Sequence, residues 1–167
     1  MVRLQLAERA DEPRLFDAMQ DYLREMAPLY GDEPDENGVY PYPWLPRYFD
    51  EPRRLPYLIY NDDEWVGFAL VNDHTFRDDP ADHTIAEFTV FPARRCAGLG
   101  LAAVRALFAL HPGRWQLKFS VRNAAGKRFW EKATAPYAPS VRELNEHERR
   151  LTFHVPPRTD DKGDCET

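Results

Sequence analysis

The stretch "RRCAGLG", residues 94–100, decides how this chain of 167 residues folds. It follows "TIAEFTVF" (84–91), an apolar run typical of a strand, and precedes "LAAVRALFAL" (101–110), whose apolar residues recur at helical spacing. Glycines between a strand and a helix let backbone N–H groups approach a ligand closely. The start of a helix and two arginines favour a ligand that is anionic. The sequence therefore predicts a strand, a glycine loop that holds an anion, and a helix.

The composition is that of one globular domain. A hydrophobic content of 43% and an aromatic content of 13% are sufficient for a core, and the net charge of −6 argues against a nucleic-acid-binding protein, which would be basic. No apolar run is long enough to span a bilayer, and the N-terminus lacks the core of a signal peptide. The two cysteines, Cys96 and Cys165, do not indicate a disulfide framework and favour a reducing compartment. We therefore expect a cytoplasmic protein without membrane or nucleic-acid partners.

The other elements are predicted from periodicity and turn signals. They are a strand at 2–7, a helix from 11–13 to Pro28, a long loop with a short helix at 45–49, a hairpin around 61–63, a strand at 83–91, a helix that ends near 112–113, a strand at 115–121, a helix at 124–134 and two strands within 139–155. We expect a single domain over residues 1–155 and a flexible polar tail over 156–167.

Three readings compete for the glycine loop. A P-loop is excluded, because no Gly-Lys-Ser/Thr follows. Residues 98–103 formally match the dinucleotide fingerprint G-x-G-x-x-A, but that motif needs an acidic residue after the next strand, where this chain has Arg122 and Asn123. A turn whose glycines only allow close packing is the third reading.

The loop and a second segment further along the chain carry a resemblance to a known family. "EFTVFPARRCAGLGLAAVRALF" (87–108) and "SVRNAAGKRFWEKA" (120–133) resemble the GCN5-related N-acetyltransferases, the GNAT family. Arg95, Gly98 and Gly100 match the motif Arg/Gln-x-x-Gly-x-Gly/Ala, which in that family wraps the pyrophosphate of acetyl-coenzyme A (acetyl-CoA). The resemblance covers residues 2–155. It implies an α/β (α+β) GNAT fold, with a central mixed, mostly antiparallel, twisted sheet of about six or seven strands flanked by about four helices.

The resemblance also implies which residues hold the cofactor acetyl-CoA. Main-chain groups of the strand are expected at the pantetheine arm, and the loop and the second segment are expected at the phosphates and the rest of the molecule. The expected cofactor-binding residues are Phe88, Val90, Arg94, Arg95, Cys96, Ala97, Gly98, Leu99, Gly100, Asn123, Ala124, Phe129 and Trp130. Arg94 either adds charge at the phosphates or faces water, and both readings stay open.

Glu87 is the expected general base. Acetyl transfer needs a neutral amine, and amines are mostly protonated at neutral pH, so a carboxylate or a water chain must take the proton. Glu87 lies between Ala86 and Phe88 on the strand that enters the loop, where burial would raise its pKa. The alternative is an acid that faces solvent on an alternating strand.

The expected acid departs from the family pattern. The position after Phe129 usually holds a tyrosine that protonates the leaving thiolate, but here it is Trp130, whose indole N–H cannot deliver a proton. Tyr137, seven residues further on, is the substitute candidate. A thiolate also leaves unaided, because thiol pKa values are about 8.5.

The loop at 30–50 is expected to form the acceptor pocket. Its aromatic residues Tyr30, Tyr40, Tyr42 and Trp44 suit a cationic amine through cation–π contacts, although core packing is an equal alternative for the last three. The acidic run 32–36 is expected to face solvent. His74 and His83 lie near several aspartates without a ligand geometry, so we expect no metal site.

The leading hypothesis is an acetyl-CoA-dependent N-acetyltransferase that acts on the primary amine of a small molecule by direct attack in a ternary complex. A protein N-terminus or a lysine is the alternative acceptor, and a non-catalytic acyl-CoA-binding module is the alternative class. Members of the family are often dimers, so a homodimer is an open option.

Overall fold

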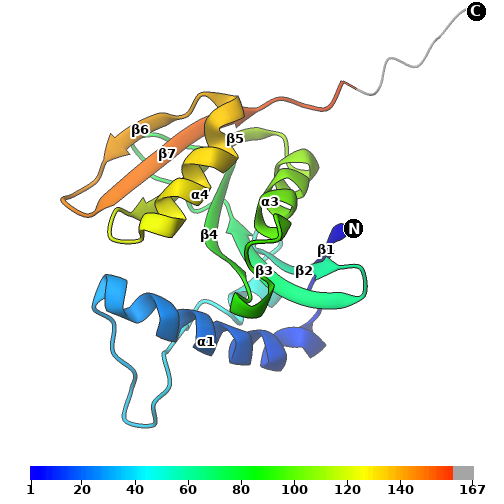
Figure 1. The fold of residues 1–167 in the computed structure, drawn as a ribbon, viewed down its shortest axis with the longest axis vertical. Coiled ribbons are helices and arrows are strands. Elements are labelled where there is room, and N and C mark those ends of the chain that lie inside the picture. Colours follow the sequence, from blue (N-terminus) through cyan, green and yellow to red (C-terminus); the bar gives the residue numbers. More distant parts are fainter. Residues whose placement is uncertain (160–167) are drawn as a thin grey trace, which may run out of the picture.

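The computed structural model of the protein describes residues 1–159. In it the chain forms one sheet with helices on both faces (Figure 1). The strands are β1 (Val2–Leu6), β2 (Leu55–Asn61), β3 (Glu64–Asn72), β4 (His83–Val90), β5 (Gly113–Ser120), β6 (Ser140–Glu143) and β7 (Glu148–Val155). The α-helices are α1 (Glu12–Tyr30), α2 (Arg47–Asp50), α3 (Leu99–Leu110) and α4 (Ala124–Thr134). The predicted fold class, with its mostly antiparallel sheet and about four helices, is confirmed.

The sheet has seven strands in the order β1-β2-β3-β4-β5-β7-β6. Every neighbouring pair is antiparallel except β4 and β5, which run parallel. A parallel pair needs a crossover, and here the glycine loop and α3 provide it. The predicted strand–loop–helix unit therefore connects the two strands at the centre of the sheet.

Alternating side chains of the central strands supply two separate cores. Phe68 and Leu70 of β3 pack with Leu15 and Met19 of α1, whereas Ala69 between them faces the opposite side. That opposite face packs against α3 and α4, as the ribbon shows (Figure 1). The large apolar side chains of β5 lie on the α3–α4 side too, whereas α1 covers the other face at β2 and β3.

The pairing of β4 with β5 is short. Only three residue pairs join them, from His83 opposite Trp115 to Ile85 opposite Leu117. The register of β4 against β3 also shifts. Leu70 lies opposite Glu87 and the next residue, Val71, lies opposite Ile85, so β4 has one extra residue between these two pairs. Such an extra residue bends a strand and re-aims its side chains. The second half of β4 therefore has an unpaired edge toward β5.

The helix predicted to stop at Pro28 is longer than expected. α1 contains Pro28 and continues to Tyr30, and Gly31 ends it in the left-handed conformation with a φ of 74°. A proline near the end of a helix removes one backbone hydrogen bond, and the residues that follow it here remain helical. This extension brings Tyr30 onto the helix rather than into the loop.

The other predicted elements are confirmed within a few residues, including the short helix (α2) and the hairpin at 61–63. No helix among residues 1–159 is long and apolar enough to cross a membrane. Cys165 and most of the predicted tail lie outside the described residues.

We predict that Gly67→Ala loosens the β3–β4 pair. A Cβ at Gly67 would lie 2.2 Å from the carbonyl oxygen of Thr89 and 3.0 Å from the Cα of Val90, and backbone atoms cannot rotate away. We expect the free energy of unfolding to fall by about 3 kcal/mol in a urea titration. Gly38→Ala is the matched control, because a Cβ there meets nothing within 4 Å and only its φ of 75° is unfavourable. A loss about equal in both variants would contradict the predicted clash.

Candidate active site

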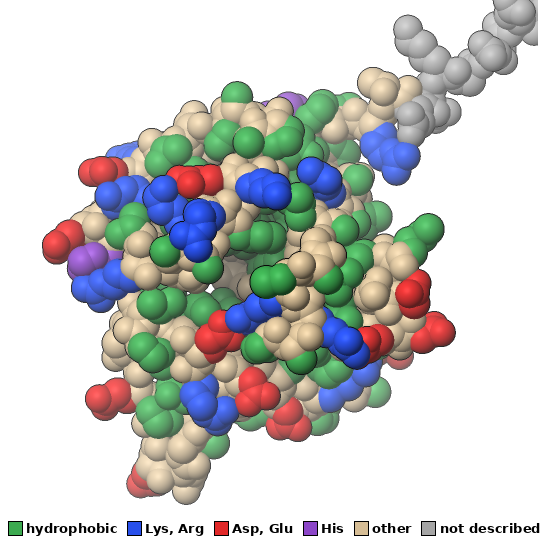
Figure 2. Space-filling model, viewed as in Figure 1, with side chains coloured by type: hydrophobic (Ala, Val, Ile, Leu, Met, Phe, Trp, Pro, Cys, Tyr) green, Lys and Arg blue, Asp and Glu red, His purple; other side chains and the backbone are tan. Residues whose placement is uncertain are grey.

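A cavity of about 920 Å³ opens where β4 and β5 separate. Its walls come from α1, β4, β5, the glycine loop and α4. Figure 2 shows its mouth as a hollow near the centre of the molecule, with Lys and Arg side chains gathered on the upper side, where Figure 1 places α4. The cavity therefore reaches both the α3–α4 side and the α1 side of the sheet.

The glycine loop forms one wall of this cavity. Gly98, with a φ of 75°, is the N-cap of α3 and provides no side-chain cap, so the first N–H groups of the helix lack acceptors of their own. Gly100 lies against the ring of Phe129, where a Cβ would be 3.1 Å from the ring carbon Cε2. An uncapped helix start beside a cavity fits a diphosphate, which accepts several N–H donors.

The two arginines of the loop bind carboxylates. The guanidinium of Arg95 donates to Glu25 of α1 at 2.6 and 2.9 Å, and its Nε donates to the carbonyl oxygen of Val90 at 2.8 Å. Arg94 donates from Nε to Glu64 at 2.9 Å. Arg95 thus fastens the loop to α1 and to β4, and both arginines line the cavity with their charges paired to carboxylates.

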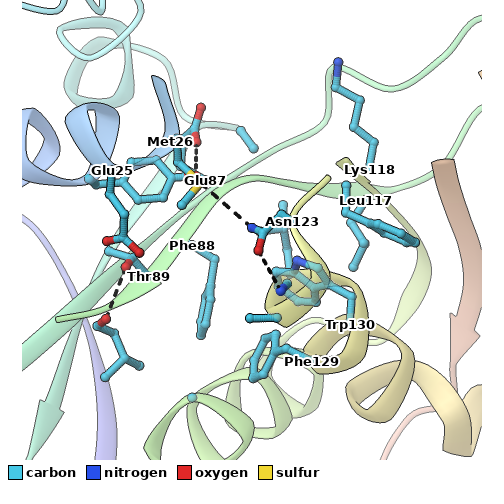
Figure 3. A pocket seen from close by; sticks show the side chains of 18 of the residues that line it. Glu25, Met26, Glu87, Phe88, Thr89, Leu117, Lys118, Asn123, Phe129 and Trp130 are labelled. Carbon is cyan, nitrogen blue, oxygen red and sulfur yellow. Dashed lines mark hydrogen bonds between the residues drawn. The ribbon is translucent and has the colours of Figure 1, made fainter. Parts of the chain in front are cut away.

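Three aromatic rings line the α3–α4 side of the cavity. Phe88 stacks on Phe129 with ring centroids 5.5 Å apart, and Trp130 meets Phe88 edge-on at 5.4 Å. Figure 3 shows the three rings close together, while Glu87 lies nearer to Met26 of α1. These rings form an apolar wall of the kind that a pantetheine arm requires.

Asn123 has a structural contact that the sequence did not show. Its Oδ1 accepts the N–H of Gly126 at 2.9 Å and caps α4, and its Nδ2 lies 4.0 Å from the sulfur of Met26. Both contacts are drawn in Figure 3. Asn123 therefore fixes the start of α4 and lies opposite α1 across the cavity.

Glu87 lies at the cavity with both carboxylate oxygens bound. Tyr22 of α1 donates to Oε2 at 2.7 Å, and Tyr42 donates to Oε1 at 3.3 Å. Burial raises the pKa of Glu87 to about 7, while the two hydroxyl donors and the charge of Lys118 act in the opposite direction. A carboxyl with a pKa near neutrality exchanges protons readily under physiological conditions.

Tyr22 is a site residue that the sequence analysis missed. It lies three residues after Met19 on α1, and its ring packs edge-on against Phe68 at 5.7 Å. Burial and the neighbouring Glu87 raise its pKa well above the ordinary value, so the phenol keeps its proton. A tyrosine on the inward face of a helix needs a hydrogen-bond partner for its hydroxyl. That requirement is the feature of the sequence that could have identified Tyr22 as a site residue.

The four aromatic residues expected at the acceptor separate into three groups. Tyr30 lines the cavity. Tyr42 is connected to it only through the hydrogen bond that its hydroxyl donates to Glu87. Tyr40 is held through its backbone by the side-chain amide of Gln20 at 2.8 Å. Trp44 is 48% exposed and packs against Arg47 and Arg54, away from the cavity.

The remaining predicted residues also have definite places. Tyr137 stacks on Phe153 at 5.7 Å and meets Phe108 edge-on at 5.6 Å, and it does not line the cavity. Ala97 and Ala124 are not among the lining residues, whereas the rest of the predicted cofactor set is. Cys96 is exposed at the loop with a φ of 65°. Among residues 1–159 no group of His, Cys, Asp or Glu could hold a metal ion.

The sequence matches one family model. The acetyltransferase (GNAT) family matches residues 15–134, which include most of α1, the central strands, the glycine loop and α4. A comparison of the sequence with curated proteins finds no match.

Solved structures share the fold at low sequence identity. An acetyltransferase from Thermus thermophilus is 17% identical, with 93% of this chain and 97% of that chain covered and a TM-score of 0.68. The aminoglycoside acetyltransferase AAC(6')-Ib in complex with coenzyme A is 19% identical, with 92% and 95% covered and a TM-score of 0.67. The ribosomal-protein-S18-alanine N-acetyltransferase from Escherichia coli is 14% identical, with 96% and 98% covered and a TM-score of 0.59.

We predict that Tyr22→Phe raises the pKa of Glu87. The hydroxyl of Tyr22 donates to the carboxylate and stabilises its ionised form, so its removal favours the protonated form by about one pKa unit. Tyr42→Phe should raise the pKa less, because its bond is 3.3 Å long. The measurement is a titration of the Glu87 side-chain carboxyl carbon by NMR.

Tyr60→Phe is the control for this titration, because the Tyr60 hydroxyl accepts from Arg14 at 3.2 Å and does not line the cavity. It should leave the pKa of Glu87 unchanged. An unchanged or lowered pKa in Tyr22→Phe would show that the hydroxyl does not stabilise the carboxylate.

Proposed function

The chain belongs to the acetyltransferase (GNAT) family, and from this premise we propose that it transfers the acetyl group of acetyl-CoA to a primary amine of a small molecule. Membership makes it an acetyl-CoA-dependent acetyltransferase. The finer proposal is direct attack by the amine in a ternary complex. The observation that carries it is Glu87, a carboxyl with a pKa of about 7 on the wall of the cavity.

The residues present fit acetyl-CoA. The uncapped start of α3 and the glycines before it would hold the pyrophosphate, and Phe88, Phe129 and Trp130 would flank the pantetheine arm. Lys132 of α4 also lines the cavity and adds positive charge there. When bound, acetyl-CoA supplies an activated thioester carbonyl and a thiolate leaving group.

Glu87 takes the proton of the amine. Each of its oxygens already accepts one tyrosine hydroxyl, and each keeps a further lone pair for the amine or for a bridging water. The tyrosines hold the carboxylate in one orientation and keep it partly ionised despite burial. The proton therefore moves to Glu87 Oε, while both tyrosines remain neutral.

The unpaired edge of β4 supports the reacting carbonyl. Past Ile85 the strand has no β5 partner, so backbone groups of residues 86–90 on that edge line the cavity, except the carbonyl oxygen of Val90, which accepts from Arg95. A backbone N–H aimed at a developing oxyanion contributes about 3 kcal/mol. We assign this role to main-chain groups of β4.

Neither of the two side chains considered from the sequence can act as the acid. Trp130 cannot deliver a proton, and Tyr137 is packed between Phe108 and Phe153 away from the cavity. Thiols are acidic enough, with a pKa of about 8.5 for the cysteine side chain, that a thiolate leaving group would not require a general acid from the chain.

We propose a small molecule rather than a protein segment as the acceptor because the site is recessed. Glu87 lies beneath Tyr42 of the loop between α1 and α2, and Tyr22 covers its other oxygen. Proteins of similar fold acetylate an aminoglycoside in one case and a ribosomal protein in another.

The cytoplasmic location and the homodimer stay predictions from the sequence.

We predict that Glu87→Gln lowers kcat by about 100-fold or more, because the amide cannot accept the proton. The measurement is thiol release from acetyl-CoA across a panel of primary amines. In the wild type, kcat/KM should rise with pH through a limb near pH 7, where Glu87 of the free enzyme loses its proton, and this limb should vanish in the variant. Asp63→Asn, in the β2–β3 turn, is the control and should keep wild-type activity.

The same variant has a stability readout that separates loss of chemistry from loss of fold. Because the folded pKa of Glu87 lies above its ordinary value of 4.5, the ionised carboxylate disfavours folding as the pH rises from 4.5 to about 7. Glu87→Gln should therefore raise Tm at about pH 8 and leave it nearly unchanged at about pH 4. Wild-type turnover in this variant at every pH would refute Glu87 as the base.

We predict that Trp130→Phe keeps kcat within about threefold of the wild type, because the indole N–H transfers no proton. It should lower Tm, since the indole packs against Phe88 and Phe129. Tyr137→Phe is the companion variant and should also leave kcat unchanged. A loss of about 100-fold in either variant would identify that residue as a participant in the chemistry.

A further inference from the structure

The α1 side of the cavity carries charges from three elements. Apart from the ion pair of Arg95 with Glu25, they are Asp32, just after α1, Glu87 on β4 and Lys118 on β5. Lys118 forms an ion pair with Glu148 at 2.9 Å, so its charge is balanced within the protein. Asp32 has no ion-pair partner among residues 1–159. The uncompensated charge at this end of the cavity is therefore negative.

Asp32 shares this space with the proposed base. Burial is the main cause of the raised pKa values of Glu87 and Tyr30, and the charge of Asp32 raises both further. Its neighbours Glu33, Asp35 and Glu36 do not line the cavity, and Asp35 instead accepts the N–H groups of Asn37 and Val39. Of the acidic run 32–36, only Asp32 faces the site.

Two partly exposed aromatic rings line the same cavity. Tyr30 is 45% exposed and Phe76 is 39% exposed, and both belong to the cavity wall. The guanidinium of Arg150 already lies over the ring of Phe76, 4.6 Å from its centroid, so this ring accepts a cation. The face of Phe76 is thus already occupied, whereas Tyr30 lies two residues before Asp32, and an exposed aromatic ring beside a carboxylate binds an ammonium group and the methylenes next to it.

We propose that the acceptor carries at least two basic nitrogens, one that is acetylated at Glu87 and a second, cationic one that is bound by Asp32 beside Tyr30. This diamine or polyamine class rests on the proposed function. Asp32 is then a specificity-determining residue, since it touches the part of the acceptor that does not react. An acceptor with a carboxylate instead would need Lys118, which Glu148 already occupies.

The test compares three acceptors with the same reacting end: putrescine, butylamine and γ-aminobutyrate. In thiol-release assays the wild type should prefer putrescine to butylamine by about tenfold in kcat/KM, well above the factor of about two that two equivalent nitrogens give. Asp32→Asn should bring this ratio close to that factor, because only putrescine has a second nitrogen for Asp32 to bind. Glu33→Gln, which removes the neighbouring charge outside the cavity, should keep the wild-type ratio.

Several outcomes would overturn the proposal: equal use of putrescine and butylamine by the wild type, an unchanged ratio in Asp32→Asn, or the highest kcat/KM for γ-aminobutyrate. Calorimetric titration of the same three compounds into the protein with coenzyme A separates this proposal from the proposed function. If no amine is acetylated, the function fails. Tighter binding of putrescine than of butylamine, lost in Asp32→Asn, would still support the diamine site, and its absence would refute it.

Discussion

The separation of β4 from β5 after three paired residues is the constraint on which the rest of the site depends. A continuous sheet would divide the molecule into two cores with no passage between them. Because β4 bends at the register shift before Glu87 and loses its β5 partner, its unpaired edge lines a cavity that reaches both faces. The start of α3, where we propose that the pyrophosphate binds, and the proposed acceptor side therefore meet at one strand.

The proposed chemistry follows from the position of Glu87 on that strand. Burial opposes its charge and by itself would keep it protonated, and two tyrosine donors moderate that effect to give a pKa of about 7. This arrangement lowers the stability of the folded protein. A carboxyl group whose pKa is raised by folding disfavours the folded state once the pH exceeds its ordinary pKa. Strained or costly groups of this kind gather at functional sites.

The sequence predicted what depends on local pattern. The glycine loop, the strand before it and the helix at 124–134 were all predictable, because turn chemistry and periodicity are properties of neighbouring residues. Glu87 was predictable as a candidate, because a lone acid in an apolar strand is unusual. The C-terminal end of α1 was not predictable, because proline usually ends a helix, whereas α1 continues past Pro28 to Tyr30.

What the sequence did not show are contacts between distant segments. The bond of Tyr22 to Glu87 spans 65 positions and the ion pair of Arg95 with Glu25 spans 70, and no local pattern encodes either. The same holds for Asp32, which differs from its acidic neighbours only in facing the cavity. Tyr137 has the residue type that an acid requires, but its packing between two phenylalanines keeps it from the cavity.

The proposed base and the acceptor loop are physically coupled through Tyr42. This residue belongs to the loop between α1 and α2. Two hydrogen bonds between the side-chain amide of Gln20 and the backbone of Tyr40 fasten that loop to α1. A displacement of the loop changes the donor on Glu87, and with it the pKa of the base. Loop changes that suit another amine therefore also alter the pH dependence of transfer. The hydroxyl of Tyr42 thus links the position of the loop to the proposed proton transfer.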